Sequence, residues 1–254
     1  MMEFRRSAGA VLRSVALYSF CAASTAASAE EFQQPKFTPE DTWVYHEKSQ
    51  RGAKVNEVDV ELSVVRSEGD DLLVAAKPAG SSQAPRQTMY KSDWSRFRGI
   101  NGVETIVMRP LSFPLSVGKS WSVEYTEINP DAAHSKEQFT IPFKAVAWED
   151  VETPAGKFKA LKIVANGNWV ADVVARTRID TGVAGAPGAA QMSRQDVVQG
   201  PRRIEGRVYH AIWYVPAVKR WVKSIDETFS SDGQVMDHAE SELTAFHVGG
   251  AQTP

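Results

Sequence analysis

The stretch GRVYHAIWYVPAVKRWVKSIDETF, residues Gly206–Phe229, decides the fold. Its two halves are rich in β-branched and aromatic residues, and Pro216-Ala217 separates them. Such runs on either side of a short turn predict an antiparallel hairpin, and proline is tolerated in the turn because no ladder bond is needed there. Alternation along the first strand predicts that both of its faces are partly polar: one carries Arg207, Tyr209, Ala211 and Trp213, and the other carries Val208, His210, Ile212 and Tyr214.

The same alternation of apolar and polar residues recurs along most of the chain. A period of two predicts strands with one buried and one wet face, and Gly-, Pro-, Asn- or Asp-containing turns separate the runs. We therefore predict an all-β protein with little helix: a large curved antiparallel sheet, open or partly closed as a barrel, of roughly twelve strands. Besides the hairpin, the predicted strands include Thr42–Lys48, Lys54–Arg66, Leu72–Lys77, Arg86–Ser92, Val103–Arg109, Ser120–Ile128, Glu137–Val151, Phe158–Ala165, Asn168–Asp180 and Gln234–Phe246.

The first residues have the pattern of an export signal. Three arginines precede the short apolar run Ser14–Ala23, and Ala27-Ser28-Ala29 supplies small residues where a signal peptidase cuts. We predict a signal peptide over residues 1–29, cleavage after Ala29, and a periplasmic or secreted protein. Lipid modification of Cys21 is the weaker alternative, because Phe20 stands where such a site needs a small residue.

The exported part reads as one β-rich domain over residues 30–248, followed by a tail over 249–254. Within it, Thr181–Pro201 is rich in Gly and Ala and shows no sustained period. We expect a flexible loop there, and an unstructured loop of this length is usually either a disordered insertion or a functional lid.

Composition excludes several classes of partner. The formal net charge is −2 and no basic tract occurs, so neither nucleic acid nor an anionic membrane surface is an expected partner. No apolar run approaches the ~20 residues of a membrane-spanning helix. Removal of the signal peptide also removes the only cysteine, Cys21, so we expect neither disulfides nor a thiol nucleophile.

The residues usually needed for catalysis do not form a recognisable set. None of the five histidines stands at metal-ligand spacing from another, and the chain has no G-x-S-x-G nucleophile motif. Neighbouring acid–base pairs such as Asp237-His238 point to opposite faces of a strand. We therefore predict a protein that is not an enzyme, with no catalytic residues, no cofactor and no metal site.

Basic residues near the expected loop are the candidates for ligand binding. Arg176 and Arg178 share one face of a strand, and Arg207 and Tyr209 share one face of the hairpin. Guanidinium groups favour planar, bidentate contacts with a carboxylate or another anionic head group. The alternative is a solvated face on which these arginines pair with acidic side chains across strands.

Three motifs carry a resemblance to a known group: PLSVGKSW at Pro114–Trp121, PAGKFKAL at Pro154–Leu161, and WYVP at Trp213–Pro216 followed by VKRWVK at Val218–Lys223. Together they resemble the bacterial exported TapB-like domains of unknown function, over Leu111–Phe246. The resemblance implies a curved antiparallel sheet and brings no catalytic residues with it. The Thr181–Pro201 stretch departs from the pattern of the group.

These observations predict a non-enzymatic binding or carrier module for an amphipathic ligand or envelope component. Two alternatives stay open. The first is a structural or interaction protein of the cell envelope that docks a partner protein through a sheet edge or the expected loop. The second is a hydrolase whose site is assembled from distant strands.

Overall fold

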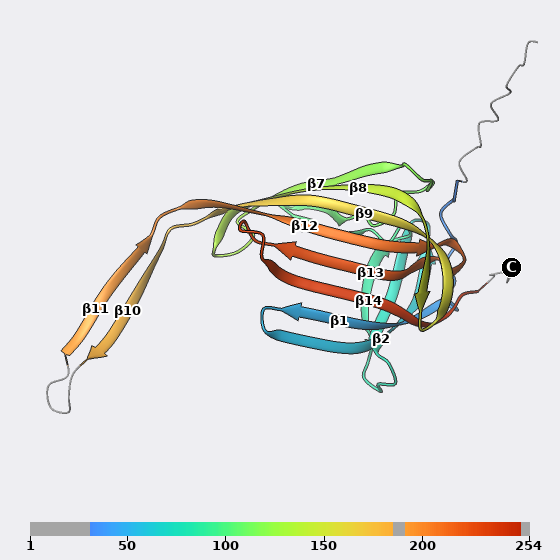
Figure 1. Ribbon diagram of the computed structural model, residues 1–254, viewed down its shortest axis with the longest axis horizontal. Helices are drawn as coiled ribbons and strands as arrows, with labels where there is room; N and C mark the ends of the chain where they lie inside the picture. Colours follow the sequence, from blue (N-terminus) through green and yellow to red (C-terminus); the bar gives the residue numbers. More distant parts are fainter. Residues whose placement is uncertain (1–30, 185–190, 250–254) are drawn as a thin grey trace, which may run out of the picture.

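The structure is a computed structural model that describes residues 31–184 and 191–249, and, within 176–199, the backbone only. The described part is built almost entirely from β-strands, which confirms the predicted fold class (Figure 1). Its single short helical element is a 3₁₀ turn, η1, at Pro216–Val218. The strands are β1 (Thr42–Arg51), β2 (Lys54–Glu68), β3 (Asp71–Pro78), β4 (Arg86–Lys91), β5 (Arg96–Ile100), β6 (Val103–Met108), β7 (Ser120–Ile128), β8 (His134–Thr153), β9 (Gly156–Val173), β10 (Arg176–Ala184), β11 (Gln191–Gln199), β12 (Arg202–Val215), β13 (Arg220–Phe229) and β14 (Val235–His247). Within the described residues, no helix is both long and apolar enough to cross a membrane.

Ten of these strands form one antiparallel sheet. Its order is β4-β3-β2-β1-β14-β13-β12-β9-β8-β7, so the sheet is open, with β4 and β7 at its edges. The first and last strands, β1 and β14, pair near the middle of the sheet, from Thr42 opposite His247 to Arg51 opposite Asp237. The separate β5–β6 hairpin contacts both β4 and β7, and lies behind β12–β14 in Figure 1.

The hairpin predicted from Gly206–Phe229 is present. Strands β12 and β13 pair from Arg207 opposite Phe229 to Val215 opposite Arg220, and η1 makes the turn. Lys219 completes the turn in the left-handed region, at φ 61°. At the other end, Gly206 is required by close packing, because a Cβ there would lie 2.1 Å from the Phe229 carbonyl oxygen and 2.6 Å from the Trp169 ring.

The expectation of a loop over Thr181–Pro201 is wrong for most of that stretch. Its described residues belong largely to β10 and β11, which pair with each other in a separate two-stranded ribbon. Residues 185–190 lie outside the described part of the chain. The ribbon continues the β9–β12 ladder in the same register, because Val173 opposes Arg202 and Arg176 opposes Gln199. The strand pairing that starts in the large sheet thus outweighs the local sequence, which by itself predicts a loop. Figure 1 shows the ribbon projecting away from the sheet.

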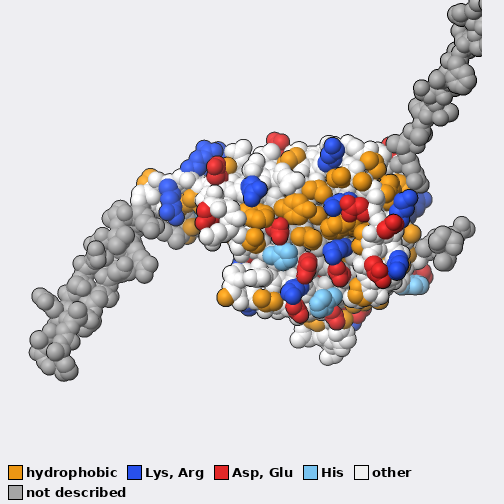
Figure 2. All heavy atoms as spheres, in the orientation of Figure 1, with side chains coloured by type: hydrophobic (Ala, Val, Ile, Leu, Met, Phe, Trp, Pro, Cys, Tyr) orange, Lys and Arg blue, Asp and Glu red, His pale blue; other side chains and the backbone are white. Residues whose placement is uncertain are grey.

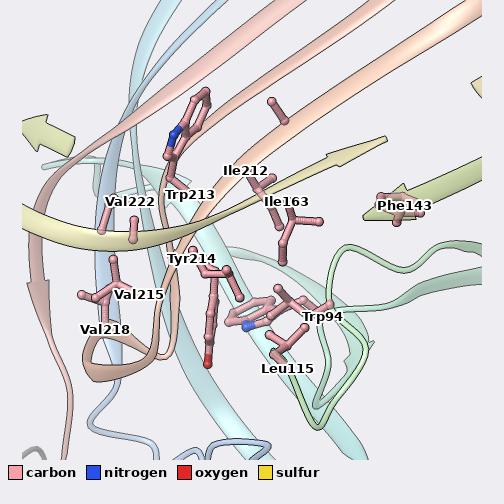
Figure 3. Close-up of a cluster of buried hydrophobic side chains, with 14 of the residues drawn as sticks. Trp94, Leu115, Phe143, Ile163, Ile212, Trp213, Tyr214, Val215, Val218 and Val222 are labelled. Atoms are coloured by element: carbon pink, nitrogen blue, oxygen red, sulfur yellow. The ribbon is translucent and has the colours of Figure 1, made fainter. Parts of the chain in front are cut away.

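The register assigns one face of the sheet to the main hydrophobic core. Val208 and Ile212 of β12 lie opposite Gly167 and Ile163 of β9, on the face that β4, β5 and β6 cover. Figure 3 shows Ile163, Ile212 and Tyr214 directed toward Trp94 and Leu115. Trp94 belongs to the connection between β4 and β5 and is 1% exposed.

A buried ion pair joins the hairpin turn to both ends of the domain. The Lys219 Nζ lies 2.9 Å from Oδ1 of Asp41, a residue that is 0% exposed, and donates a further hydrogen bond to the Gly249 carbonyl. The Asp41 carboxylate also accepts bonds from the backbone N–H groups of Thr38 and Gly249. The buried Asp41 carboxylate needs this cation, because a buried charge without a counter-ion is strongly destabilising.

We expect Lys219→Met to lower the free energy of unfolding by about 3–5 kcal/mol, because it leaves the Asp41 charge buried without a counter-ion. Urea denaturation followed by circular dichroism measures this. Lys157→Met is the matched control, since the Lys157–Glu152 pair is exposed and its loss should cost less than about 1 kcal/mol. Equal effects of the two substitutions would contradict a structural role for the buried pair.

Candidate ligand-binding site

A cavity of about 310 Å³ lies on the covered face of the large sheet. Its walls come from β1, β2, β4, β5, β8, β9 and β12–β14, together with Trp94 and the end of β6. The apolar part of the lining includes Val58, Tyr90, Met108, Phe143, Ile163 and Ile212. Both halves of the sheet therefore contribute to one chamber, whose lining combines apolar with polar and charged side chains.

Arg220 is the charged group at the centre of an aromatic cluster in this cavity. Its residue is 9% exposed, and its guanidinium carbon lies 3.8 Å from the Trp94 ring centroid and 4.1 Å from that of Trp221. The rings of Tyr45 and Trp43 follow at 5.4 and 5.9 Å. Cation–π attraction to these rings offsets part of the cost of removing the guanidinium from water.

Hydrogen bonds do not offset the rest of the cost of burying the Arg220 guanidinium. The Nε and Nη1 atoms of Arg220 are buried and have no hydrogen-bond partner among the described residues. A buried polar group left without a partner costs about 1–3 kcal/mol, and more when it is charged. The site therefore holds an arginine that contacts aromatic rings, has two nitrogens without partners among the described residues, and has the Glu47 carboxyl as a nearby acidic group.

Two groups of β1 stand beside this arginine. The Tyr45 hydroxyl donates a hydrogen bond to the Trp221 carbonyl at 2.5 Å, and burial raises the pKa of Tyr45 while the Arg220 charge opposes the rise. Glu47 lies on the same face, two residues along the strand, and lines the cavity. Burial raises the pKa of the Glu47 carboxyl above its ordinary value, and Arg220 opposes this shift only in part.

His210 is the second polar group with an unused hydrogen-bonding atom. Its Nδ1 lies 2.5 Å from Oδ1 of Asp226, whereas its Nε2 is buried and has no partner among the described residues. The nearby Ser224 hydroxyl bonds instead with that of Ser241, at 2.8 Å. A nucleophile–base pair needs the serine hydroxyl on the histidine nitrogen, so these residues do not form one in this arrangement.

The cavity can thus hold a molecule with an apolar body and an anionic end. The aromatic and aliphatic walls supply the apolar surface, and Arg220 supplies a cation with free N–H donors. This division into many apolar contacts and a few directed polar groups is typical of small-molecule sites.

The residues predicted to bind a ligand do not gather at this cavity. Arg207 and Tyr209 lie on the opposite face of β12 from His210 and Ile212, and the Arg207 guanidinium stands 5.0 Å from the Phe229 ring centroid. Because the covering strands lie behind β12–β14 in Figure 1, Figure 2 shows this opposite face, with an apolar band bordered by mixed charges. Arg176 and Arg178 belong to β10 in the ribbon, and their side chains lie outside the described part.

The sequence contained a signal for the residue that was missed. Arg220 shares its face of β13 with Val222, Ser224 and Asp226, so it is a large cation on a face that otherwise carries small or apolar groups near the turn. The pairing of His210 with Asp226, by contrast, left no signal in the sequence, because Asp226 is sixteen residues away. Only the strand register brings the two together.

One further group of titratable residues lies apart from the cavity. Asp131, His134 and Glu137 have ligand atoms within 4.8 Å of one another. The His134 Nδ1 lies 3.1 Å from an Asp131 oxygen and 3.2 Å from a Glu137 oxygen. The backbone N–H of Ala133, followed by His134, lowers the pKa of Asp131. These contacts are those of an ion-pair network that holds a turn.

The raised pKa of Glu47 predicts how stability depends on pH. A carboxyl whose pKa is higher in the folded than in the unfolded protein contributes stability that is lost as pH rises through the folded pKa. We therefore expect Glu47→Gln to raise the free energy of unfolding relative to the wild type more at about pH 7 than at about pH 3.5. Urea titrations of both proteins at the two pH values measure the difference, and an equal or smaller gain at neutral pH would contradict the burial of this charge.

No protein-family model matches the chain, and no curated protein does, so the resemblance to the TapB-like group stays a prediction. Among solved structures, the chain is similar to a "putative lipoprotein" from Parabacteroides distasonis, with a TM-score of 0.38 and 14% identity over 85% of this chain and 97% of that one. It is also similar to a "putative exported protein with YmcC-like fold" from Bacteroides fragilis, with a TM-score of 0.37 and 14% identity over 87% of this chain and all of that one. At this level of similarity, neither structure is a basis for inference about the site.

Proposed function

We propose that the protein is an exported, non-enzymatic binding or carrier module for an amphipathic ligand. The observation that supports this most is the chamber of about 310 Å³ on the covered face of the large sheet, whose lining combines aromatic and aliphatic side chains with polar and charged ones. Cavities of this size, at the lower end of the ~300–1,000 Å³ typical of ligand sites, admit a small molecule. The export signal predicted from residues 1–29 supports a location in the periplasm or outside the cell for such a module.

A binding role also agrees with the way in which the polar groups of the chamber are arranged. The His210 imidazole is held by Asp226, and the Ser224 and Ser241 hydroxyls are bonded to each other. These groups can orient a ligand without attacking it. A hydrolase would need a nucleophile bonded to its base.

A neutral apolar fluorophore, N-phenyl-1-naphthylamine, tests whether the chamber binds ligands. We expect the wild type to bind it with enhanced fluorescence, and Ala239→Phe to weaken binding at least about tenfold, because Ala239 lines the chamber and the ring would fill it. The matched control is Ala245→Phe on the same strand, where the residue is exposed and binding should not change. Absence of binding by the wild type, or equal loss in both variants, would contradict the proposal.

Docking of a partner protein is the second candidate, and the projecting ribbon favours it. In the described residues β10 pairs with β11 alone, so the outer edges of both strands carry backbone groups free to pair with another chain. The ribbon stands clear of the large sheet in Figure 1.

Removal of the ribbon separates the two candidates. Replacing residues 174–201 with Asn-Gly joins Val173 to Arg202, which already face each other across the ladder, through a two-residue hairpin turn. We expect the shortened chain to fold and to bind N-phenyl-1-naphthylamine as the wild type does. If the shortened chain no longer cross-links to an envelope protein but still binds the probe, the ribbon is the docking site. If a folded shortened chain no longer binds the probe, the proposal that the large sheet and its covering strands form the binding chamber without the ribbon is wrong.

A further inference from the structure

We infer that Arg220 is the anchor for the anionic head group of a single-chain amphiphile, whose apolar chain lies along the adjoining wall of the chamber. This inference rests on the proposed binding function and specifies its ligand class. It assigns a binding role to a residue that lies in the predicted hairpin but outside the predicted set of ligand-binding residues.

The first argument is the unsatisfied hydrogen-bonding capacity of Arg220. Two of its nitrogen atoms are buried without partners, although the residue is only 9% exposed and lines the cavity. Buried N–H groups are almost always bonded in native proteins, so unpaired donors on a residue that lines a cavity indicate an acceptor bound next to it. An anionic oxygen is an acceptor for these donors and a counter-charge for the guanidinium.

The second argument is how the guanidinium is held. Trp94 and Trp221 both contact it, and their rings are inclined at 69° to each other, so the guanidinium meets aromatic surface on two sides. These contacts restrict the side chain and leave Nε and Nη1 without a hydrogen-bond partner among the described residues. A cation fixed in this way is preorganised for a planar or tetrahedral oxyanion.

The third argument is the composition and size of the chamber beyond the guanidinium. The wall continues through Met108, Phe143, Ile163 and Ile212, which offer apolar contacts and no charge. A volume of about 310 Å³ suits one hydrocarbon chain with a small head group. The other charged groups of the lining are Glu47, Lys48, Arg96, Asp226 and Glu240; of these, Lys48 pairs with Glu57, and Asp226 contacts His210. Glu47 disfavours a second negative charge nearby, so an anionic ligand must gain more from Arg220 than it loses to Glu47.

Three ten-carbon probes with different head groups test the inference: decanoate, decyl phosphate and decanol, titrated into the full-length mature protein by calorimetry. We expect the wild type to bind at least one of the anionic probes about ten- to a hundredfold more tightly than decanol, since hydrogen bonds to charged groups are the strong ones. The tighter of the two anionic probes identifies the head group as a carboxylate or a phosphate.

Arg220→Met should remove the preference for the anionic probes while leaving decanol affinity within about twofold, because the substitution keeps apolar bulk between the rings and deletes the charge. Arg207→Met is the matched control on the opposite face of the sheet and should change none of the affinities. Arg220→Lys, which keeps a charge but loses the planar fork, should give intermediate affinity and serves if Arg220→Met does not fold.

The outcomes distinguish the two levels of the proposal. If decanol and both anions fail to bind the wild type, the binding function itself is wrong. If decanol binds but the anions bind no more tightly, or if a folded Arg220 variant loses affinity for all three probes equally, the chamber binds ligands and the role of Arg220 as a head-group anchor is wrong.

Discussion

Trp94 occupies the point on which the covered face of the sheet depends. Its ring lies within 6 Å of the ring centroids of Phe37, Trp43, Tyr90 and Trp221, and its indole N–H donates to the Lys219 carbonyl. A curved, open sheet exposes an apolar concave face unless something covers it. The chain meets this need with a residue from the β4–β5 connection that contacts strands from both halves of the sheet. The connection adopts a left-handed backbone at Trp94, φ 62°, which packing on all sides must outweigh.

The same aromatic cluster also surrounds a residue whose burial is unfavourable for stability. Arg220 stacks on Trp94 and Trp221, yet keeps buried donors without partners. An apolar residue at this position would satisfy the packing at lower cost, since buried charges are seldom favourable for stability alone. Local departures from the rules of stable packing are expected at functional positions. The buried Asp41–Lys219 pair, one residue before Arg220, is by contrast fully bonded and ties the turn to the ends of the domain.

The pattern of residues along the chain was enough to predict the fold but not the candidate site. The alternation in Gly206–Phe229 predicted the hairpin and the all-β class, because a period of two follows directly from strand geometry. It also showed that both faces of β12 are mixed, but not which of them is covered. Which face of β12 is covered depends on where β4–β6 pack. The residue types of Tyr209 and His210 do not reveal which of the two lies on the covered face. The ribbon β10–β11 was missed for a related reason: its register is inherited from the β9–β12 ladder, which pairs residues from twenty-nine to fifty-three positions apart.

The central position of the β1–β14 ladder has a kinetic consequence. Strands β1–β4 form by successive local hairpins, whereas within the ten-stranded sheet they join the remaining strands through β1 and β14, whose paired residues are roughly two hundred positions apart. Contacts of such separation form late, because the closure entropy of the long intervening chain must be met first. The cavity takes walls from both sides of this ladder. The complete cavity should therefore form only in the final step of folding, after the last strand has paired with the first.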